Sequence, residues 1–220
     1  MNKFAASVED YGAEHAAQFD QVKETQMLYT FCTNNERKWG DVKAVMPNLN
    51  LCTSRMLPEI QGTADEVALQ KVKDALKVML LRSGGSDVRV VIEDTSVRID
   101  QLNGAPGPYA RDFFRGLDDE QLGRLAAVLE HNPAATAESR VVSAHYVDGD
   151  LKVKMYMVAQ RGSLRYPLGE FDGEWARMFV PEGEQQSMAE MQPRESAKYN
   201  ARMRCAAEFG LAEGLLRRKE

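Results

Sequence analysis

Two apolar segments, each followed directly by polar residues, constrain the fold of this chain most strongly. The first, Met27–Cys32, leads into the polar segment TNNERK, and the second, Val88–Ile92, leads into the triplet EDT. Short apolar runs of this kind are typical of buried strands. Burying an unpaired carboxylate costs several kcal/mol, so we expect Glu93 and Asp94 at the strand end, with a metal ion, a base or water as partner.

Helix signals alternate with these strands. The segment 36–45 has helical character, and Thr63 and Glu66 form a capping box that opens the next helix. Further helices are predicted at 119–130 and from Pro193 to Phe209. The stretch around Asp148-Gly149 has period-two character on both sides of the turn, which predicts a β-hairpin. This order of elements favours an α/β domain built around a mixed sheet.

The composition excludes several classes of function. The 220 residues are 44% hydrophobic and 28% charged, which fits one globular domain with appended pieces. A net charge of -5 argues against bulk attraction to nucleic acid or to an anionic membrane. We find no apolar run of about 18 residues and no secretory signal, so we expect no membrane partner.

The cysteines point to a reducing compartment. Cys32, Cys52 and Cys205 are odd in number, widely spaced and free of any CxxC pair. We interpret them as reduced core residues of a cytoplasmic protein.

The motifs divide the chain into three parts. Residues 1–26 are predicted to form an N-terminal helical or partly disordered arm, residues 27–212 the main domain, and residues 213–220 a charged tail.

The two polar segments predict a ligand site. In α/β sheets, ligands bind outside the carboxyl ends of strands, so both segments are expected to face one crevice. Loop amides, the start of the helix at 36 and the charge of Lys38 favour an anion there. The alternative for Lys38 is a solvated side chain beside a capped helix. Lys71 borders the apolar stripe of its helix, where a lysine can also simply extend its charged end into water.

The acids in these segments suggest metal chemistry. Glu59 falls in a stretch without helical period, and with Glu93 and Asp94 it offers the oxygen ligands that Mg²⁺ prefers. Lys38 and Lys71 would neutralise substrate phosphates, and an acid beside the metal would activate the attacking water.

Five motifs occur in order along the chain, namely TNNERK, LPEIQGTADEVALQK, EDTSV, LNGAPGPYARDFF and FVPEGEQQSMAEM. Together they resemble one known family, the inosine triphosphate pyrophosphatase (HAM1-like nucleoside triphosphate pyrophosphatase) family. The resemblance covers Tyr29 to Phe209, and no Walker-type phosphate loop is present.

The resemblance implies a fold, a reaction and a set of roles. The implied fold is ITPase/Maf-like, with an elongated mixed sheet flanked by helices and a nucleotide cleft between two lobes. The implied reaction cleaves a nucleoside triphosphate to the monophosphate and pyrophosphate with Mg²⁺, in a homodimer. Asp94, Lys38 and Glu93 would be catalytic, with Glu59 and Asp94 binding the metal. Substrate contacts would come from Thr33, Asn34, Asn35, Glu36, Arg37, Lys38, Lys71 and Thr95.

The half of the family pattern that reads the base is changed. In the segment GEWARMF, Trp175 is kept for stacking on the base, but Ala176 and Arg177 replace an Asp-Pro pair. On the last helix only Arg202 remains of a Ser-His-Arg triplet, with Lys198 as a substitute for a nearby lysine. Without the resemblance, Trp175 would be a core residue and Arg202 a solvated one.

Three functions remain open from sequence. The first is a Mg²⁺-dependent pyrophosphatase acting on deaminated purine nucleotides such as ITP and XTP. The second is the same reaction with its base specificity shifted, for example to shape a nucleotide pool for a virus or mobile element. The third is a nucleotide-binding module without turnover, which the intact Lys38, Glu59, Lys71 and Asp94 argue against.

Overall fold

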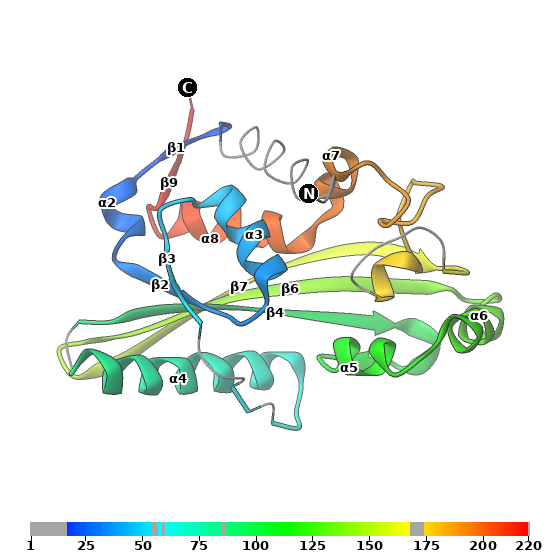
Figure 1. Ribbon diagram of the computed structural model, residues 1–220, viewed down its shortest axis with the longest axis horizontal. Helices are drawn as coiled ribbons and strands as arrows, with labels where there is room; N and C mark the ends of the chain where they lie inside the picture. The colour runs from blue at the N-terminus through cyan, green and yellow to red at the C-terminus, as the bar shows by residue number, and fades with distance from the viewer. Residues whose placement is uncertain (1–16, 54–56, 59, 85–86, 168–173, 220) are drawn as a thin grey trace. The chain divides into compact units, whose positions relative to one another are not determined.

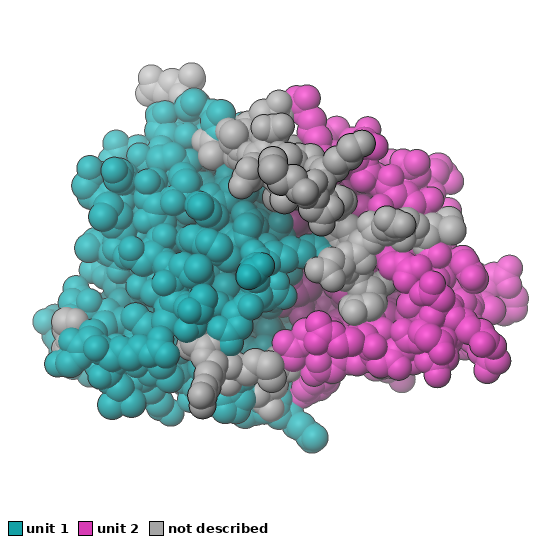
Figure 2. Space-filling view, viewed as in Figure 1, with its two compact units in different colours: residues 1–94, 140–157, 202–220 teal, residues 95–139, 158–201 magenta. Residues whose placement is uncertain are grey.

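The computed structural model describes residues 17–53, 57–58, 60–84, 87–167 and 174–219. Two compact units are distinguished in Figure 2: unit 1 comprises residues 1–94, 140–157 and 202–220, and unit 2 comprises residues 95–139 and 158–201. Three long strands contribute residues to both units, namely β4 (Arg89–Ile99), β6 (Ala134–Val147) and β7 (Asp150–Leu164).

The strands form a mixed sheet, as predicted. The strand order is β3-β2-β4-β6-β7-β8, with β5 paired to β4. In unit 1, β2 runs parallel to both β3 and β4, while in unit 2 β5 and β8 pair antiparallel with β4 and β7. Helices flank the sheet, so the predicted α/β class is confirmed (Figure 1).

Unit 1 places helices on both faces of its strands. In Figure 1, α4 covers one face, and α3 and α8 lie on the other. Its remaining elements are short strands and one short helix. The bounds are β1 (Phe19–Gln21), α2 (Lys23–Gln26), β2 (Tyr29–Cys32), α3 (Glu36–Val45), β3 (Asn50–Cys52), α4 (Ala64–Ser83), α8 (Ala201–Ala212) and β9 (Leu216–Arg218).

Two apolar layers hold these helices to the sheet. On the α4 side, Val72, Ala75 and Leu76 pack with Val90 and Ile92 of β4. On the α8 side, the ring of Phe209 meets Tyr29 and Tyr156 edge-on, with centroids 5.8 and 5.7 Å apart. Cys32, Cys52 and Cys205 are buried and form no disulfide, which confirms the interpretation of the cysteines as core residues.

Both ends of the described chain are built into unit 1. Strand β1 pairs antiparallel with β9. The fully buried Gln26 donates to the carbonyl of Leu215 at 2.9 Å and accepts from the amide of Asn48 at 3.0 Å. Segments expected to be an arm and a tail thus contribute ordered structure at 17–26 and 213–219. Residues 1–16 lie outside the described residues, and the limits at 26 and 212 stay a prediction.

Unit 2 has its own apolar core, formed by buried residues such as Phe114, Leu122, Met178 and Phe179. Its elements are mostly short. The bounds are η1 (Asp100–Leu102), β5 (Pro106–Gly107), α5 (Ala110–Arg115), α6 (Asp119–Val128), η2 (Glu174–Arg177), β8 (Phe179–Pro181), α7 (Pro193–Ser196) and η3 (Ala197–Tyr199).

Most local predictions are confirmed. The helix at 36–45 has the predicted bounds, and Thr63 and Glu66 form the capping box of α4. Asp148 and Gly149 adopt positive φ at the hairpin turn, at 51° and 86°. Among the described residues, no helix combines the length and the apolar character needed to cross a bilayer.

Two local predictions are wrong. Strand β4 does not end at the acids but continues to Ile99, because Val97 and Ile99 are buried in the core of unit 2. The last predicted helix is interrupted, because Asn200 adopts an extended conformation between η3 and α8.

Gly162 tests how closely β7 and β8 pack. A Cβ at Gly162 would lie 2.3 Å from the carbonyl oxygen of Val180, and backbone cannot move aside as a flexible side chain can. We expect Gly162→Ala to lower the free energy of unfolding by about 1–3 kcal/mol. Gly40→Ala is the matched control, since nothing lies within 4 Å of its Cβ position in α3, and it should leave stability unchanged or raise it. Equal changes in the free energy of unfolding for Gly162→Ala and Gly40→Ala, measured by urea denaturation, would contradict this close packing.

Candidate active site

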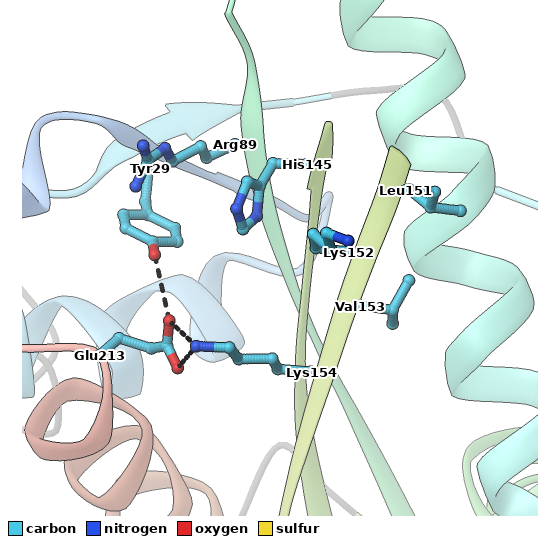
Figure 3. Close-up of a pocket in the computed structure, with 8 residues that line it drawn as sticks. All are labelled: Tyr29, Arg89, His145, Leu151, Lys152, Val153, Lys154 and Glu213. Carbon is cyan, nitrogen blue, oxygen red and sulfur yellow. Dashed lines mark hydrogen bonds and ion pairs between the residues drawn. The ribbon is translucent and has the colours of Figure 1, made fainter. Parts of the chain in front are cut away.

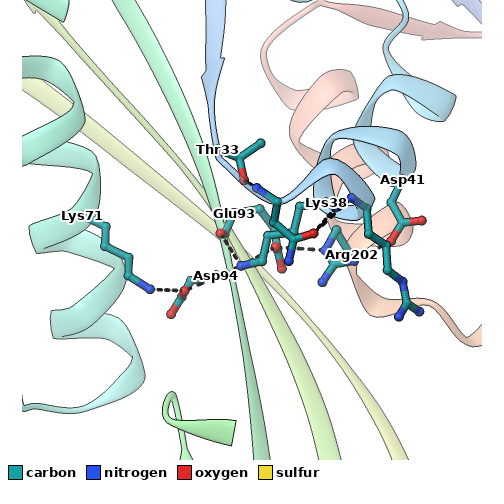
Figure 4. Close-up of polar contacts among 9 residues, drawn as sticks. Thr33, Lys38, Asp41, Lys71, Glu93, Asp94 and Arg202 are labelled. Atoms are coloured by element: carbon teal, nitrogen blue, oxygen red, sulfur yellow. Dashed lines mark hydrogen bonds and ion pairs between the residues drawn. The ribbon is translucent and has the colours of Figure 1, made fainter. Parts of the chain in front are cut away.

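The two adjacent acids lie inside β4, buried at 5% and 4% exposure. Parallel pairing of β2 with β4 stops at Val91, so Glu93 and Asp94 lie just beyond the end of β2. Successive side chains of a strand point to opposite faces, so the two acids meet different helices. Glu93 contacts Arg202 of α8, and Asp94 contacts Lys71 of α4 (Figure 4).

Lys38 joins the two polar segments that the sequence predicts at one site. Its Nζ donates to the main-chain oxygen of Glu93 at 3.0 Å and lies 3.1 Å from Glu93 Oε2 and 3.9 Å from Asp94 Oδ1. The side chain is only 19% exposed. The alternative of a solvated lysine is therefore wrong.

Helix α3 begins where it can present Lys38 to β4. Asn35 caps the helix, and its Oδ1 accepts from the amides of Arg37 and Lys38 at 3.0 and 3.1 Å. Thr33 Oγ1 in turn accepts from the amide of Asn35 at 3.1 Å. The predicted phosphate segment is thus a capped turn that leads directly from β2 into the helix carrying the lysine.

Lys71 is a second cation on the same acid. Its Nζ lies 2.6 Å from Asp94 Oδ1, and its side chain is 13% exposed, so an ion pair replaces the solvated alternative. The first turn of α4 is fixed by Asp65, which accepts from Arg140 Nε of β6 at 2.6 Å. This contact, together with the apolar face of α4, fixes the helix that carries Lys71.

Arg202 is fully engaged by carboxylates. Its Nε donates to Glu93 Oε2 at 2.9 Å, and its second contact is with Asp41 Oδ2 of α3. Burial lowers the pKa of Arg202, but the charges of Glu93 and Asp41 raise it by more, so the net pKa lies above its ordinary value. The alternative of a solvated Arg202 is wrong.

Asp41 was not predicted from the sequence. It lies three residues after Lys38 in a helix that the sequence does predict, and residues at this spacing share one helix face. That spacing was the available signal. The spacing did not reveal the partner of Asp41, which is Arg202, 161 residues further along the chain.

These contacts form one cluster in which charges of opposite sign are equal in number. We call it the ion cluster, and its three acids and three bases are Asp41, Glu93, Asp94, Lys38, Lys71 and Arg202. All six residues belong to unit 1. Pairing is required, because an isolated charge at this depth would cost several kcal/mol.

The described residues do not make a complete metal cage. They contain no group of three or more His, Cys, Asp or Glu side chains placed to hold a metal ion. Glu59, the other predicted metal ligand, lies outside the described residues. Mg²⁺ commonly uses only one or two carboxylates and takes its other ligands from water and substrate phosphates. Both contacts of Asp94 to lysines involve Oδ1, which suits Asp94 as a single carboxylate ligand of a metal shared with substrate.

The other predicted phosphate contacts adjoin residues of this cluster in the sequence, with Thr95 as the first residue of unit 2 and the rest in unit 1. Asn34 and Glu36 are exposed at the start of α3, and Arg37 is half-buried. Thr95 directly follows Asp94 in β4 and is half-buried.

The predicted base-reading residues of unit 2 make internal contacts. Trp175 is half-buried, and its ring meets Phe179 of the unit 2 core at 5.7 Å between centroids, which fits the core alternative. Ala176 is buried, and Arg177 makes two contacts with Asp119 at 2.7 and 3.2 Å. Lys198 is exposed in η3. A role for Trp175 in base stacking stays a prediction.

Comparison with known proteins gives one consistent family. The sequence model of the Ham1 family matches residues 29–210. An inosine triphosphate pyrophosphatase of Neurospora crassa is 30% identical over 188 residues, which cover 84% of this chain and 92% of the relative.

Solved structures share the fold. The Ham1 protein of Staphylococcus aureus superposes with a TM-score of 0.63 at 19% identity, over 84% of this chain and 96% of that one. A HAM1 protein of Coxiella burnetii gives a TM-score of 0.65 at 18% identity, over 82% of this chain and 94% of that one.

The buried contacts of Arg202 predict a large effect on stability. Arg202→Met would leave Glu93 and Asp41 without this cation, and removal of one partner of a buried pair costs about 3–5 kcal/mol. The control is Arg124→Met, because Arg124 pairs with Glu120 on the exposed face of α6 and should lose less than about 1 kcal/mol. Denaturant unfolding measures both. A loss of under 1 kcal/mol for Arg202→Met would contradict the pairing seen here.

Proposed function

The chain belongs to the Ham1 family, and we propose that it is a nucleoside triphosphate pyrophosphohydrolase whose reaction centre is the ion cluster. The observation that supports this proposal is the pairing of Lys38 and Lys71 with Asp94, because a phosphate-cleaving centre needs cations for the phosphates beside an acid that activates water. The products are the nucleoside monophosphate and pyrophosphate. The default substrates are the deaminated purine nucleotides ITP, dITP and XTP.

The lysines exchange partners when substrate binds. In the structure, Lys71 and Lys38 neutralise Asp94 and Glu93. A triphosphate carries more negative charge than a single carboxylate, so it attracts both lysines away from Asp94. The oxygen atoms of Asp94 then lose their contacts to the lysines. The segment from Thr33 to Lys38, which includes the N-terminus of α3, then lines the phosphates.

The two acids take different roles. Glu93 is held by Arg202 and Lys38, so it fixes the position of the lysine. Asp94 becomes available once Lys71 moves to phosphate, and it accepts the proton of the attacking water. Family members generally use a divalent metal, and we propose Mg²⁺ held by Asp94 and Glu59. When bound, Mg²⁺ supplies positive charge to the phosphate oxygens and favours loss of a proton from the water.

A shift in base specificity is the second candidate. Ala176 has no hydrogen-bonding side chain, and Arg202 already donates to two carboxylates. A base edge would therefore have to compete for Arg202. Sites that lose polar pairing with their substrate lose discrimination against analogues.

The homodimer implied by the resemblance and the cytoplasmic location inferred from the cysteines remain proposals. Light scattering on the purified chain tests the first. A monomer at micromolar concentration would exclude a stable dimer.

Asp94 and Lys71 test the reaction centre. Asp94→Asn and Lys71→Ala should each lower kcat for pyrophosphate release by at least about a hundredfold, since each removes a charge that contacts phosphate or activates water. Lys77→Ala is the matched control on the same helix, because Lys77 is 71% exposed and pairs only with Asp74 in the described contacts. Rates are measured with ITP at saturating Mg²⁺ and again in EDTA.

Two outcomes would exclude this site. Near-wild-type turnover by folded Asp94→Asn would remove Asp94 from the mechanism. Tight ITP binding by the wild-type chain without any release of pyrophosphate would instead identify a nucleotide-binding module.

Base specificity is tested by a nucleotide panel. We expect kcat/KM for dITP and dXTP to exceed that for the four ordinary deoxynucleotides by less than roughly a hundredfold, or about 2.7 kcal/mol. A larger preference would show that other groups read the deaminated base, and it would restore the default substrates.

Lys38→Ala and Lys71→Ala should lower the rate for every nucleotide equally, because the triphosphate is common to all.

A further inference from the structure

A second polar pocket lies within unit 1, apart from the ion cluster. Its volume is about 500 Å³, which is in the range of pockets that hold small ligands. Figure 3 shows the side chains that line it. They are Tyr29, Arg89, His145, Leu151, Lys152, Val153, Lys154 and Glu213.

The pocket lies at the opposite end of the parallel strands from the ion cluster. Tyr29 and Arg89 are the first residues of β2 and β4 and are register partners. Glu93 follows Arg89 by four residues, so the two sites are separated by about 13 Å along β4. No residue is shared between the two sites.

Arg89 makes this pocket chemically unusual. It is half-buried, its guanidinium lies over the ring of Tyr29 with Cζ 5.7 Å from the centroid, and no carboxylate of the described residues pairs with it. Its Nε is buried and has no hydrogen-bond partner among the described residues. A buried donor on a charged group is costly when it is unpaired. An anion in the pocket would remove that cost.

His145 also lines the pocket and carries a second unpaired nitrogen. Its Nδ1 is buried and also has no hydrogen-bond partner in the described part of the chain. Burial and the charge of Arg89 hold the pKa of His145 below its ordinary value, and Lys154 acts in the same direction. Asp87 and Glu213 oppose this effect.

The charged side chains of the pocket are unequal in number. Three cations, Arg89, Lys152 and Lys154, face one carboxylate, Glu213. Glu213 is occupied by Lys154 at 2.8 Å, by the hydroxyl of Tyr156 and, at 3.4 Å, by that of Tyr29. Among the described residues, the one ion pair of Lys152 is with the exposed Asp150, at 3.3 Å. Positive charge is thus in excess in a chain whose net charge is -5.

We propose that this pocket binds a small phosphate-bearing anion at a site separate from the reaction centre. Arg89 and Lys152 supply the charge, Arg89 Nε donates a hydrogen bond, and protonated His145 adds another. Inorganic phosphate, pyrophosphate and a nucleoside monophosphate share this chemistry. The proposal does not depend on the proposed activity, because it concerns binding by different residues.

His145 provides a direct readout. The chain has only three histidines, His15, His131 and His145, so their imidazole NMR signals can be assigned with a His145→Gln variant. We expect saturating phosphate, pyrophosphate or nucleoside monophosphate to raise the pKa of His145, because an adjacent anion favours its protonated form. Sodium chloride at matched ionic strength controls for screening. The three ligands are titrated separately, and the one with the lowest Kd identifies the preferred source of the phosphate.

Variants separate this pocket from the reaction centre. Arg89→Gln should weaken ligand binding measured at His145 by at least about tenfold, and Lys152→Ala should weaken it as well. Lys77→Ala and Lys71→Ala should leave the response of His145 unchanged, since neither residue lines the pocket. The proposal is overturned if none of the three ligands moves the titration of His145, or if the response survives Arg89→Gln and is lost in Lys71→Ala.

Discussion

The burial of two adjacent carboxylates in the middle of β4 is the constraint on which the rest of unit 1 depends. Because neighbouring strand residues point to opposite faces, Glu93 and Asp94 each need a cation from a different helix. Lys71 comes from α4 and Arg202 from α8, while Lys38 of α3 reaches both acids. The capping of α3 by Asn35 and the contact of Asp65 with Arg140 are the local features that hold two of these helices in register.

The ion cluster has equal numbers of positive and negative side chains, which suits a substrate that arrives with a bound cation. A free Mg²⁺ ion would have to compete with lysines for Asp94, and a free triphosphate would meet acids beside those lysines. Together they bring groups of both signs, so each resident side chain can exchange one partner for another without an uncompensated charge. Pairing in the structure therefore acts as preorganisation, because the lysines and acids are already at the place where charge develops during the reaction.

Local features were predictable from the sequence, and long-range pairings were not. The bounds of α3, the capping box of Thr63 and Glu66 and the turn at Asp148-Gly149 follow from neighbouring residues alone. The proximity of Lys38 to the acids followed from the rule for strand ends, even though β4 itself does not end there. Asp41 with Arg202 and Arg177 with Asp119 join residues 161 and 58 positions apart, and no local pattern encodes such partners. The capped end of α4 was predictable, but its contact through Asp65 with Arg140 was not.

The coupling between metal and nucleotide binding tests the central claim most directly. Isothermal titration of Mg²⁺ would be carried out with and without an ITP analogue whose α,β bridge resists hydrolysis. We expect Mg²⁺ to bind weakly to the protein alone. With the analogue bound to the protein, the Kd of Mg²⁺ should be lower by at least about tenfold, or ~1.4 kcal/mol, than its Kd for the protein alone and than its Kd for the free analogue. Equally tight Mg²⁺ binding with and without the analogue would contradict a neutral cluster that takes up metal and phosphate together.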